Sequence, residues 1–386
     1  RNLDLDFVLE SDAIAFAAEL AADYGGSLQS HKPFGTSTWA LDTTVAEKLS
    51  LSFADIPHHL DFARARSETY AHPTALPTVS PSDIERDLLR RDFSLNALAL
   101  QLSPAQASGR LLDVCGGLGD LERKLVRVLH DRSFIDDPTR ILRAWRFARR
   151  YGFEIEPMTA ELIKGALPML GRITGARVRN EMALILREPK AAEVLRNLQA
   201  LGAPKNIHPA FRVDDRLAQR LNMQPQTMPR WAEITVDDLA LRWNLLLAEV
   251  GPNAALAICQ RLDLTQRVSR SVVATAKLVA AASVLSDASA RPSEIARLLD
   301  GKPEVSLLAA WITLSPAAQK NIDDYTKRWR HLRPSISGED LKRMGLPPGP
   351  RYKTLLETLR SAWIDGDIST LEEESAYLKE LIKQDN

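Results

Sequence analysis

The chain has 386 residues, 45% of them hydrophobic, and its 50 basic residues balance its 50 acidic ones. This length can bury a large core and predicts two or three domains. Because the overall charge is balanced, a nucleic-acid partner has to bind a local basic surface. Cys115 and Cys259 are too few for a disulfide framework or a zinc site, which favours a cytoplasmic location. No apolar run reaches the roughly 20 residues of a membrane span, so we expect no membrane partner.

The first stretch, residues 2–9, alternates polar and apolar side chains, which predicts a strand whose successive side chains point to opposite faces. Asp4 and Asp6 therefore share one face. Two such carboxylates repel each other unless a cation lies between them, and Mg²⁺ prefers hard oxygen ligands. The pair indicates a metal site, and a solvated edge strand is the alternative. Because Arg1 already lies inside the strand, we expect an N-terminal piece to be missing.

A helix and three more strands are expected to follow. Ser11 is a suitable cap for a helix that runs to Tyr24 and ends at two glycines. Asp61 lies among apolar neighbours in the last of the strands, and is either a third carboxylate of the catalytic site or a partly exposed strand acid. The expected strands cover residues 36–41, 49–53 and 60–63.

A stretch with three prolines, residues 67–82, predicts a loop long enough to move over a site. After it, Arg91, Asp92 and Asn96 stand at the start of an apolar strand, residues 97–100. Arginine offers a fork of donors to a phosphate, and aspartate accepts hydrogen bonds from ribose hydroxyls. The cluster therefore indicates a nucleotide site, although a salt bridge between the neighbours Arg91 and Asp92 explains it equally well.

The chain changes character after a short predicted strand at 111–113 and a helical segment at 120–124. Asp137 and Pro138 then form a strong helix start, with Asp137 as the cap. We expect this helix to run to residue 151, with a basic face formed by Arg143, Arg146 and Arg150. Nearly everything after it is predicted to be helical. The clearest helical segments are residues 159–170, 176–187, 191–201, 236–250, 253–262, 272–285, 293–299 and 352–365.

Local charge supplies the basic surface that the whole chain lacks. Residues 121–190 contain 15 Lys or Arg against 9 Asp or Glu, which is a net charge of +6. A solvated helix face is the ordinary meaning of such a segment. Because it borders the expected metal site, contact with an RNA backbone is the alternative that we favour.

Five sequence motifs, in this order along the chain, resemble the class II CCA-adding tRNA nucleotidyltransferase and bacterial poly(A) polymerase family. The C-terminal residues 336–341 and 345–352 also look like the tail of the tRNA enzymes. The motifs are residues 3–8 (LDLDFV), 64–70 (RARSETY), 90–97 (RRDFSLNA), Asp113 with Gly116, Gly117, Asp120 and Leu121, and 136–143 (DDPTRILR).

The resemblance implies an α/β fold, a polymerase-β-like nucleotidyltransferase palm, followed by all-α neck, body and tail domains. The expected domains are residues 1–130 for the palm, 131–190 for the neck with the base-reading motif, 191–300 for the body and 301–386 for the tail, which is expected to bind tRNA. The family's first strand and glycine-rich phosphate-binding turn would lie upstream of Arg1. Two further departures are Asp136, where a glutamate is common, and Ala176, where the neck motif has a glutamate.

The resemblance also implies roles for individual residues. Asp4 and Asp6 match the metal-binding pair, and Asp61 is the expected third catalytic carboxylate. The residues expected to bind the incoming nucleotide are Arg91, Asp92, Asn96, Asp137, Arg140 and Arg143. Those expected to bind RNA are Arg146, Arg150, Arg177 and Arg179.

The function implied is template-independent, Mg²⁺-dependent addition of C, A or both to the tRNA 3′ end, with release of pyrophosphate. Its substrates would be CTP, ATP and the acceptor arm of tRNA. Asp137 can accept a hydrogen bond from the exocyclic amine of C or A, and Arg140, three residues later, can donate to the same base edge. A poly(A) polymerase of the same family and a non-catalytic RNA-binding remnant are the alternatives. Whether this chain alone is active stays open.

Overall fold

The computed structural model describes residues 5–75, 77–223, 227–232 and 238–384, and the chain divides into two compact units. Unit 1 is Arg1–Ile173 and unit 2 is Thr174–Asn386. Unit 1 contains the strands, whereas the regular elements described in unit 2 are all helical. The fold class, a small mixed sheet followed by helical parts, is therefore confirmed. The division into four domains stays a prediction.

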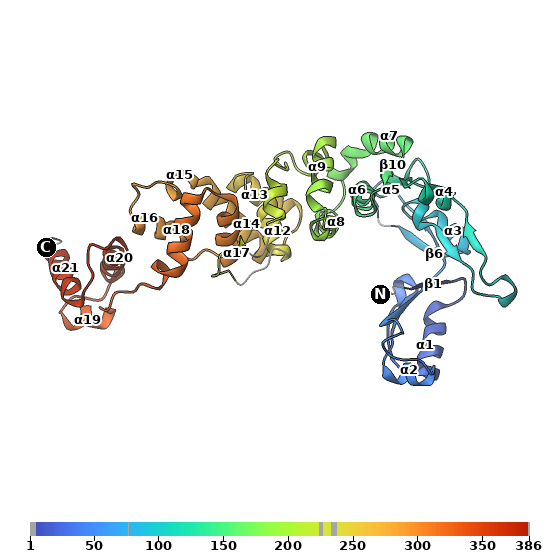
Figure 1. Cartoon of the computed structure of the whole chain (residues 1–386), viewed down its shortest axis with the longest axis horizontal. Coiled ribbons are helices and arrows are strands. Elements are labelled where there is room, and N and C mark those ends of the chain that lie inside the picture. Colours follow the sequence, from blue (N-terminus) through green and yellow to red (C-terminus); the bar gives the residue numbers. More distant parts are fainter. Residues whose placement is uncertain (1–4, 76, 224–226, 233–237, 385–386) are drawn as a thin grey trace. The chain divides into compact units, whose positions relative to one another are not determined.

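A four-stranded sheet opens unit 1, with the strand order β1-β4-β3-β2. β1 (Asp6–Leu9) is parallel to β4 (His59–Arg64), whereas β3 (Thr36–Ala40) is antiparallel to both β4 and β2 (Ser27–His31). α1 (Ala13–Tyr24) packs against β3 and β4 (Figure 1). The buried alanines of α1, Ala13 and Ala17, let the helix approach the sheet closely because their side chains are short.

Two predictions for this region are wrong. Asp12, not Ser11, caps α1, because its carboxylate accepts hydrogen bonds from the backbone N–H groups of Ile14 and Ala15. Residues 49–53 form no strand either. They follow α2 (Thr43–Lys48), and their apolar side chains are exposed, so alternation alone was misleading. The strand β2 was not predicted, because it has few apolar residues.

The proline-containing stretch is a hairpin and not the predicted loop. β5 (Arg66–Thr69) pairs antiparallel with β6 (Thr78–Pro81). Pro81 is compatible with this arrangement because the hairpin has only two strands, so a residue without an N–H can lie at its edge. α3 (Ile84–Leu89) follows, and the backbone N–H of Ile84 donates a hydrogen bond to the side chain of Glu10.

The rest of unit 1 joins two more small sheets to a set of helices. The strand β7 confirms the apolar strand predicted after the arginine motif, and β8 confirms the predicted strand at 111–113. β9 and β10 were not predicted because each has only two residues. The elements are β7 (Leu98–Leu100), β8 (Leu111–Asp113), α4 (Gly117–Glu122), β9 (Leu125–Val126), α5 (Ser133–Asp136), α6 (Thr139–Tyr151), β10 (Glu154–Ile155) and α7 (Pro157–Ala166).

α6 largely follows its prediction. It begins at Thr139, one residue later than expected, and Gly152 ends it with φ of 69°, a left-handed conformation that suits glycine. Its buried residues include Ile141, Leu142 and Ala148. Its buried residues also include Thr139, Arg140 and Arg146, so the helix buries polar groups as well as apolar ones.

Unit 2 is a succession of helices, several of which match the predicted segments. The predicted helix at 272–285 begins earlier, at Gln266, and is two helices. The predicted start at Val236 lies outside the described residues. The helices are α8 (Gly175–Arg187), α9 (Ala191–Leu201), α10 (Ala203–Ile207), α11 (Leu217–Leu221), α12 (Leu239–Leu246), α13 (Pro252–Arg261), α14 (Gln266–Ala280), α15 (Ala282–Leu285), α16 (Pro292–Leu299), α17 (Glu304–Thr313), α18 (Pro316–Lys327), α19 (Gly338–Arg343), α20 (Pro350–Asp365) and α21 (Leu371–Gln384).

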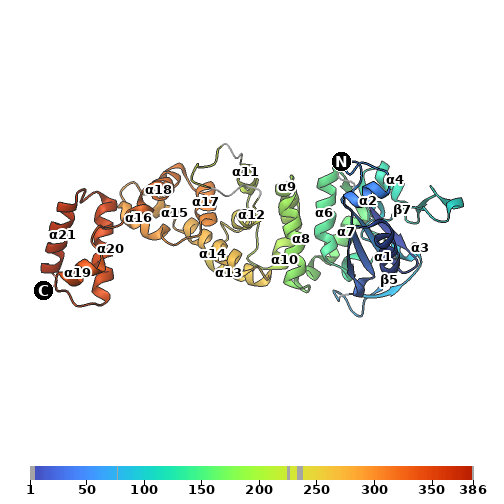
Figure 2. The ribbon, with the colours of Figure 1, turned by 90° about the horizontal axis from the view of Figure 1, so that it is seen from below.

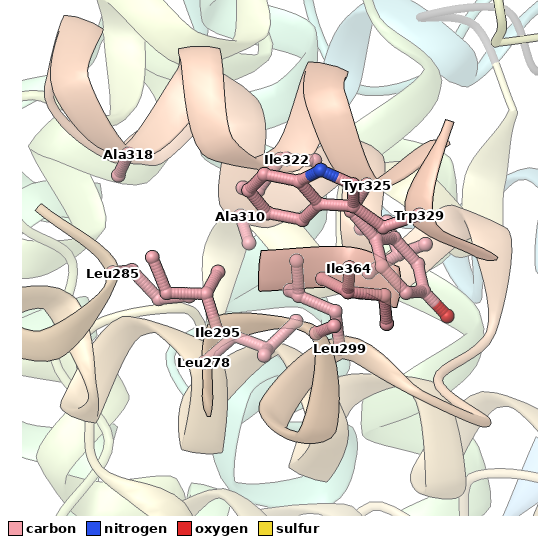
Figure 3. Close-up of a cluster of buried hydrophobic side chains, with 12 residues drawn as sticks. Leu278, Leu285, Ile295, Leu299, Ala310, Ala318, Ile322, Tyr325, Trp329 and Ile364 are labelled. Atoms are coloured by element: carbon pink, nitrogen blue, oxygen red, sulfur yellow. The ribbon is translucent and has the colours of Figure 1, made fainter. Parts of the chain in front are cut away.

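Two apolar clusters connect the later helices of unit 2. In the first, Leu278, Ile295, Ile322, Trp329 and Ile364 come together from widely separated parts of the sequence (Figure 3). Ile364 belongs to α20, so this cluster connects α20 to α16 and α18. The second cluster packs α19, α20 and α21 together, and α20 and α21 lie side by side (Figure 2). None of the helices described in the chain is long and apolar enough to span a bilayer.

Candidate nucleotide-binding site

A cavity of about 440 Å³ in unit 1 contains the whole predicted nucleotide-binding set. Its walls come from β5, from the segment after α3 and from the start of α6. These parts are far apart in the sequence, so the fold brings them together. The predicted residues that line it are Arg91, Asp92, Asn96, Asp137, Arg140 and Arg143.

Asp92 is held by two arginines of α6. Arg140 Nε lies 3.0 Å from one carboxylate oxygen of Asp92, and Arg143 binds the other. Asp92 and Arg140 are both nearly buried, with side chains 12% and 5% exposed, so water screens this pair little. The local alternative, a salt bridge between Arg91 and Asp92, is therefore wrong, because the partners of Asp92 lie about 50 residues away in the sequence.

Arg140 also fixes the far side of the cavity. Its Nη2 donates to the backbone carbonyl of Arg90 at 2.8 Å. Its Nη1 is buried and has no hydrogen-bond partner among the residues that the structure describes. A buried donor without a partner is costly.

Asp137 directly precedes Pro138, which occupies the N-cap position of α6, so the prediction of Asp137 as the cap is wrong by one residue. Its Oδ1 accepts from the backbone N–H of Thr139 at 2.9 Å and from the Thr139 hydroxyl at 2.5 Å. The carboxylate therefore supports the first turn of the helix and lines the cavity at the same time. One of its oxygens is used by Thr139, which restricts how the carboxylate can turn toward a ligand.

Arg91 and Asn96 lie on the short segment between α3 and β7. Arg91 Nη2 lies 3.3 Å from the carboxylate of Asp87, and its Nη1 donates to the backbone carbonyl of Asn96 at 3.2 Å. The side-chain oxygen of Asn96 is buried and accepts no hydrogen bond from the part of the chain that the structure describes. Behind this segment, the buried Asp120 accepts from Ser94 and Arg127, which fixes the segment to α4 and β9.

Sequence reasoning missed several lining residues, chiefly Arg66, Glu68 and Tyr70 of the β5 region. Their spacing of two in a strand was the available signal, because it places all three on one face. Because this stretch was predicted to be a loop, the spacing was not interpreted as that of a strand. Arg90 and Phe147 also line the cavity, as does Pro77.

Glu68 connects these residues. One of its oxygens lies 2.8 Å from Arg90 Nη1, and the other accepts from the Tyr70 hydroxyl at 3.0 Å. Burial, together with the charge of Glu68, raises the pKa of Tyr70 well above its usual value, so the phenol stays protonated and remains a donor. The cavity therefore combines five arginines with three carboxylates, and two of these carboxylates, Glu68 and Asp92, bind four of the arginines.

The predicted metal-binding residues are only partly described. Asp4 lies outside the described residues. Asp6 and Asp61 are cross-strand partners in the parallel pair β1–β4, which places their side chains on the same face of the sheet. Thr38 donates to Asp61 at 2.5 Å, and His59 Nε2 lies 3.5 Å from the other oxygen of Asp61.

Two carboxylates on adjacent strands are the donor set that a hard divalent cation prefers, so these residues fit a Mg²⁺ ion. Within the described ranges, no group of three or more His, Cys, Asp or Glu side chains lies close enough to hold a metal ion. The roles of Asp4, Asp6 and Asp61 stay predictions.

The arginines predicted to bind RNA differ in exposure. Arg146 is only 8% exposed, and its guanidinium lies 4.9 Å from the centre of the Phe147 ring, which argues against direct contact with a phosphate. Arg150 is exposed beside Tyr151. Arg177 and Arg179 belong to α8 in unit 2, where Arg179 binds the backbone carbonyl and the carboxylate of Asp263. Their RNA-binding roles stay predictions.

Comparison with known proteins gives consistent results. Residues 1–127 match the family model "Poly A polymerase head domain", and residues 152–214 match "Probable RNA and SrmB- binding site of polymerase A". The A-adding tRNA nucleotidyltransferase of Halalkalibacterium halodurans is 32% identical over 98% of this chain and 84% of its own length.

A second A-adding tRNA nucleotidyltransferase, from Geobacter sulfurreducens, is 32% identical over 97% of this chain, which spans only 42% of that relative. Among solved structures, the Thermotoga maritima CCA-adding enzyme in complex with tRNA aligns with a TM-score of 0.69 at 28% identity. That alignment covers 100% of this chain and 88% of the other.

Proposed function

Because the chain belongs to the family of tRNA nucleotidyltransferases and poly(A) polymerases, we propose that it adds C, A or both to the 3′ end of tRNA, without a nucleic-acid template, and releases pyrophosphate. One observation carries this proposal: all six residues expected to bind the nucleotide line a single cavity. The cavity is large enough for a nucleotide and is rich in arginine donors, which suit phosphates.

Different residues of the cavity would bind different parts of the nucleotide. Asp137 accepts from the exocyclic amine that C and A share, and Arg140 donates to an acceptor on the same base edge. U and G lack this combination of groups, so the side chains themselves select the base. Arg91 offers the N–H groups that its bonds to Asp87 and Asn96 leave over to the triphosphate, and the Asn96 side chain binds a ribose hydroxyl.

Asp6 and Asp61, with Asp4, would hold Mg²⁺ on the neighbouring sheet. Bound there, the metal would activate the RNA 3′-hydroxyl and stabilise the charge on the α-phosphate. Thr38 holds the carboxylate of Asp61 in one orientation by its short hydrogen bond. The relatives support a divalent metal in general, and the choice of Mg²⁺ rests on the carboxylate donors.

We also propose that the RNA partner is the acceptor arm of tRNA, in keeping with the tRNA complex of the similar Thermotoga enzyme. A cytoplasmic location follows from this substrate and stays part of the proposal. The family model named for a poly(A) polymerase head favours one other function, the addition of A to RNA 3′ ends in general.

The test is an incorporation assay with labelled CTP or ATP. The primers are tRNAs that end before C, after C, after CC and after CCA, together with an unrelated RNA of the same length. We expect incorporation into the incomplete tRNAs and none into the complete one. Efficient A addition to the unrelated RNA would support the poly(A) polymerase instead. Binding of tRNA with no affinity for ATP or CTP would contradict both enzymes and support a non-catalytic RNA-binding protein.

A further inference from the structure

Asp87 is a buried carboxylate that does not itself line the cavity. It belongs to α3, and its side chain is 1% exposed. An ionised carboxylate in such a place is stable only when hydrogen bonds and opposite charges surround it. The residues that surround Asp87 are three residues that do line the cavity.

The three partners approach Asp87 from different sides. Its Oδ1 accepts from the backbone N–H of Arg66 at 3.1 Å and from Arg90 Nε at 3.0 Å. Its Oδ2 lies 3.3 Å from Arg91 Nη2. One carboxylate thus fixes the start of β5 and two arginine side chains.

Arg90 carries this restraint across the cavity. The guanidinium of Arg90 binds both Asp87 and, at 2.8 Å, Glu68. The backbone carbonyl of Arg90 accepts a hydrogen bond from Arg140. Arg140 in turn binds Asp92. The network therefore runs without a break from Asp87 to the base-recognising end of the cavity.

From this geometry we propose that Asp87 is a positioning residue for nucleotide binding, and that it acts through Arg90 and Arg91. The proposal rests on the proposed function, because it assumes that a nucleoside triphosphate occupies the cavity. Asp87 touches no ligand in this role. It holds the donors of Arg90 and Arg91 in the directions that the triphosphate needs, which removes the cost of ordering two long side chains on binding.

A second explanation, that Asp87 matters only through its charge, makes the opposite prediction. Asp87→Asn removes one negative charge from beside several arginines, so electrostatics alone would strengthen the binding of an anionic triphosphate. Positioning requires weaker binding, since an amide cannot accept from both arginines as a carboxylate does. The sign of the change therefore separates the two explanations.

The experiment measures the dissociation constants of ATP and CTP by calorimetry, in Mg²⁺ buffer, with the full chain. We expect Asp87→Asn to weaken binding about tenfold, the scale expected when the residues around a binding site are loosened. Asp87→Glu keeps the charge but displaces the carboxylate by one methylene, and should also weaken binding. Unchanged or tighter binding in the variants would overturn the proposal.

The matched control is Glu374→Gln, which neutralises another fully buried carboxylate, in α21 of unit 2. This variant should lose stability and keep its affinity for ATP. A parent chain that binds neither ATP nor CTP would contradict the proposed function itself.

Circular dichroism shows whether Asp87→Asn still folds. If it does not, Asp87→Glu and the double variant Asp87→Glu/Arg91→Lys test the proposal instead. If Asp87 acts through Arg91, its substitution should weaken ATP binding much less in the Arg91→Lys background. An equal decrease in affinity in the two backgrounds would overturn the role of Arg91.

Discussion

Asp137 shows how one side chain can serve both the fold and the site. Its Oδ1 accepts from the backbone of Thr139, and it also lines the nucleotide cavity. Substitution with alanine would remove both functions together. The side chain of serine keeps a hydroxyl oxygen for the helix start but has no carboxylate for a base.

We therefore predict that Asp137→Ser folds normally and selects nucleotides poorly. Discrimination of CTP and ATP against UTP and GTP should fall by about 1–3 kcal/mol, the usual value of a good polar contact to a base. The measurement is kcat/KM for each of the four nucleotides, with circular dichroism as the control for the fold. Full selectivity in Asp137→Ser would mean that Asp137 only supports α6.

At the scale of elements, the junction of α8 and α13 depends on a glycine. A Cβ at Gly175 would lie 2.1 Å from the backbone carbonyl oxygen of Arg261, which is far below a possible contact. Only glycine therefore lets the start of α8 approach the end of α13 so closely.

Gly175→Ala should destabilise the chain by about 1–3 kcal/mol, because backbone and not a flexible side chain has to move. The control is Gly165→Ala, in α7, where a Cβ meets nothing within 4 Å. That substitution should stabilise the chain by about 0.5–1 kcal/mol, since alanine favours a helix interior. Urea unfolding measures both. Similar stabilities for the two variants would contradict the close approach.

Glu374 gives α21 a dependence on pH. Burial acts to raise its pKa, but hydrogen bonds from Ser335, Ile336 and Trp363 outweigh burial and hold the pKa below its ordinary 4.5. A group whose pKa is lowered by folding stabilises the fold above its unfolded-state pKa. That stabilisation is lost as the pH falls through the folded-state value.

The parent should thus exceed Glu374→Gln in stability at neutral pH, and the difference should shrink below about pH 4.5. Urea unfolding between pH 3 and pH 7 measures this difference. A difference that does not change over the range would show that the carboxylate is not ionised in the fold.

For the whole molecule, the basic segment predicts how RNA binding responds to salt. Each phosphate contact made by an arginine releases counterions, so affinity falls steeply with salt concentration. Arg150, which is exposed, and Arg177 are tested here, because Arg146 is buried and substitution of Arg179 would also remove its contact with Asp263.

The double variant Arg150→Ala/Arg177→Ala should flatten the salt dependence of tRNA binding, by about one unit of slope for each arginine that binds a phosphate in the parent. Filter binding between 50 and 200 mM salt is a suitable measurement. Arg110→Ala, which removes an exposed charge from unit 1 outside this segment, is the control. The same slope in the double variant and the parent would mean that the basic segment is only a solvated surface.

Much of the fold was readable from local chemistry. Helix α6 was predicted within a residue because its start, its apolar period and its final glycine all agree. The strand with Asp6 was predicted because its side chains alternate. The residues of the nucleotide site were named through the resemblance to the family, and the cavity contains all of them.

Tertiary structure decided what local chemistry leaves open. Residues 49–53 alternate like a strand but pair with no other strand. The proline-containing stretch forms a hairpin because its two strands, β5 and β6, lie opposite each other. Asp92 could have bound its neighbour Arg91, and the fold offered it Arg140 and Arg143 instead. The sequence by itself determined which residues carry charge and which segments are helical, since both depend on the chain nearby. Which carboxylate binds which arginine depends on the burial and proximity of distant segments, and only the tertiary structure sets those.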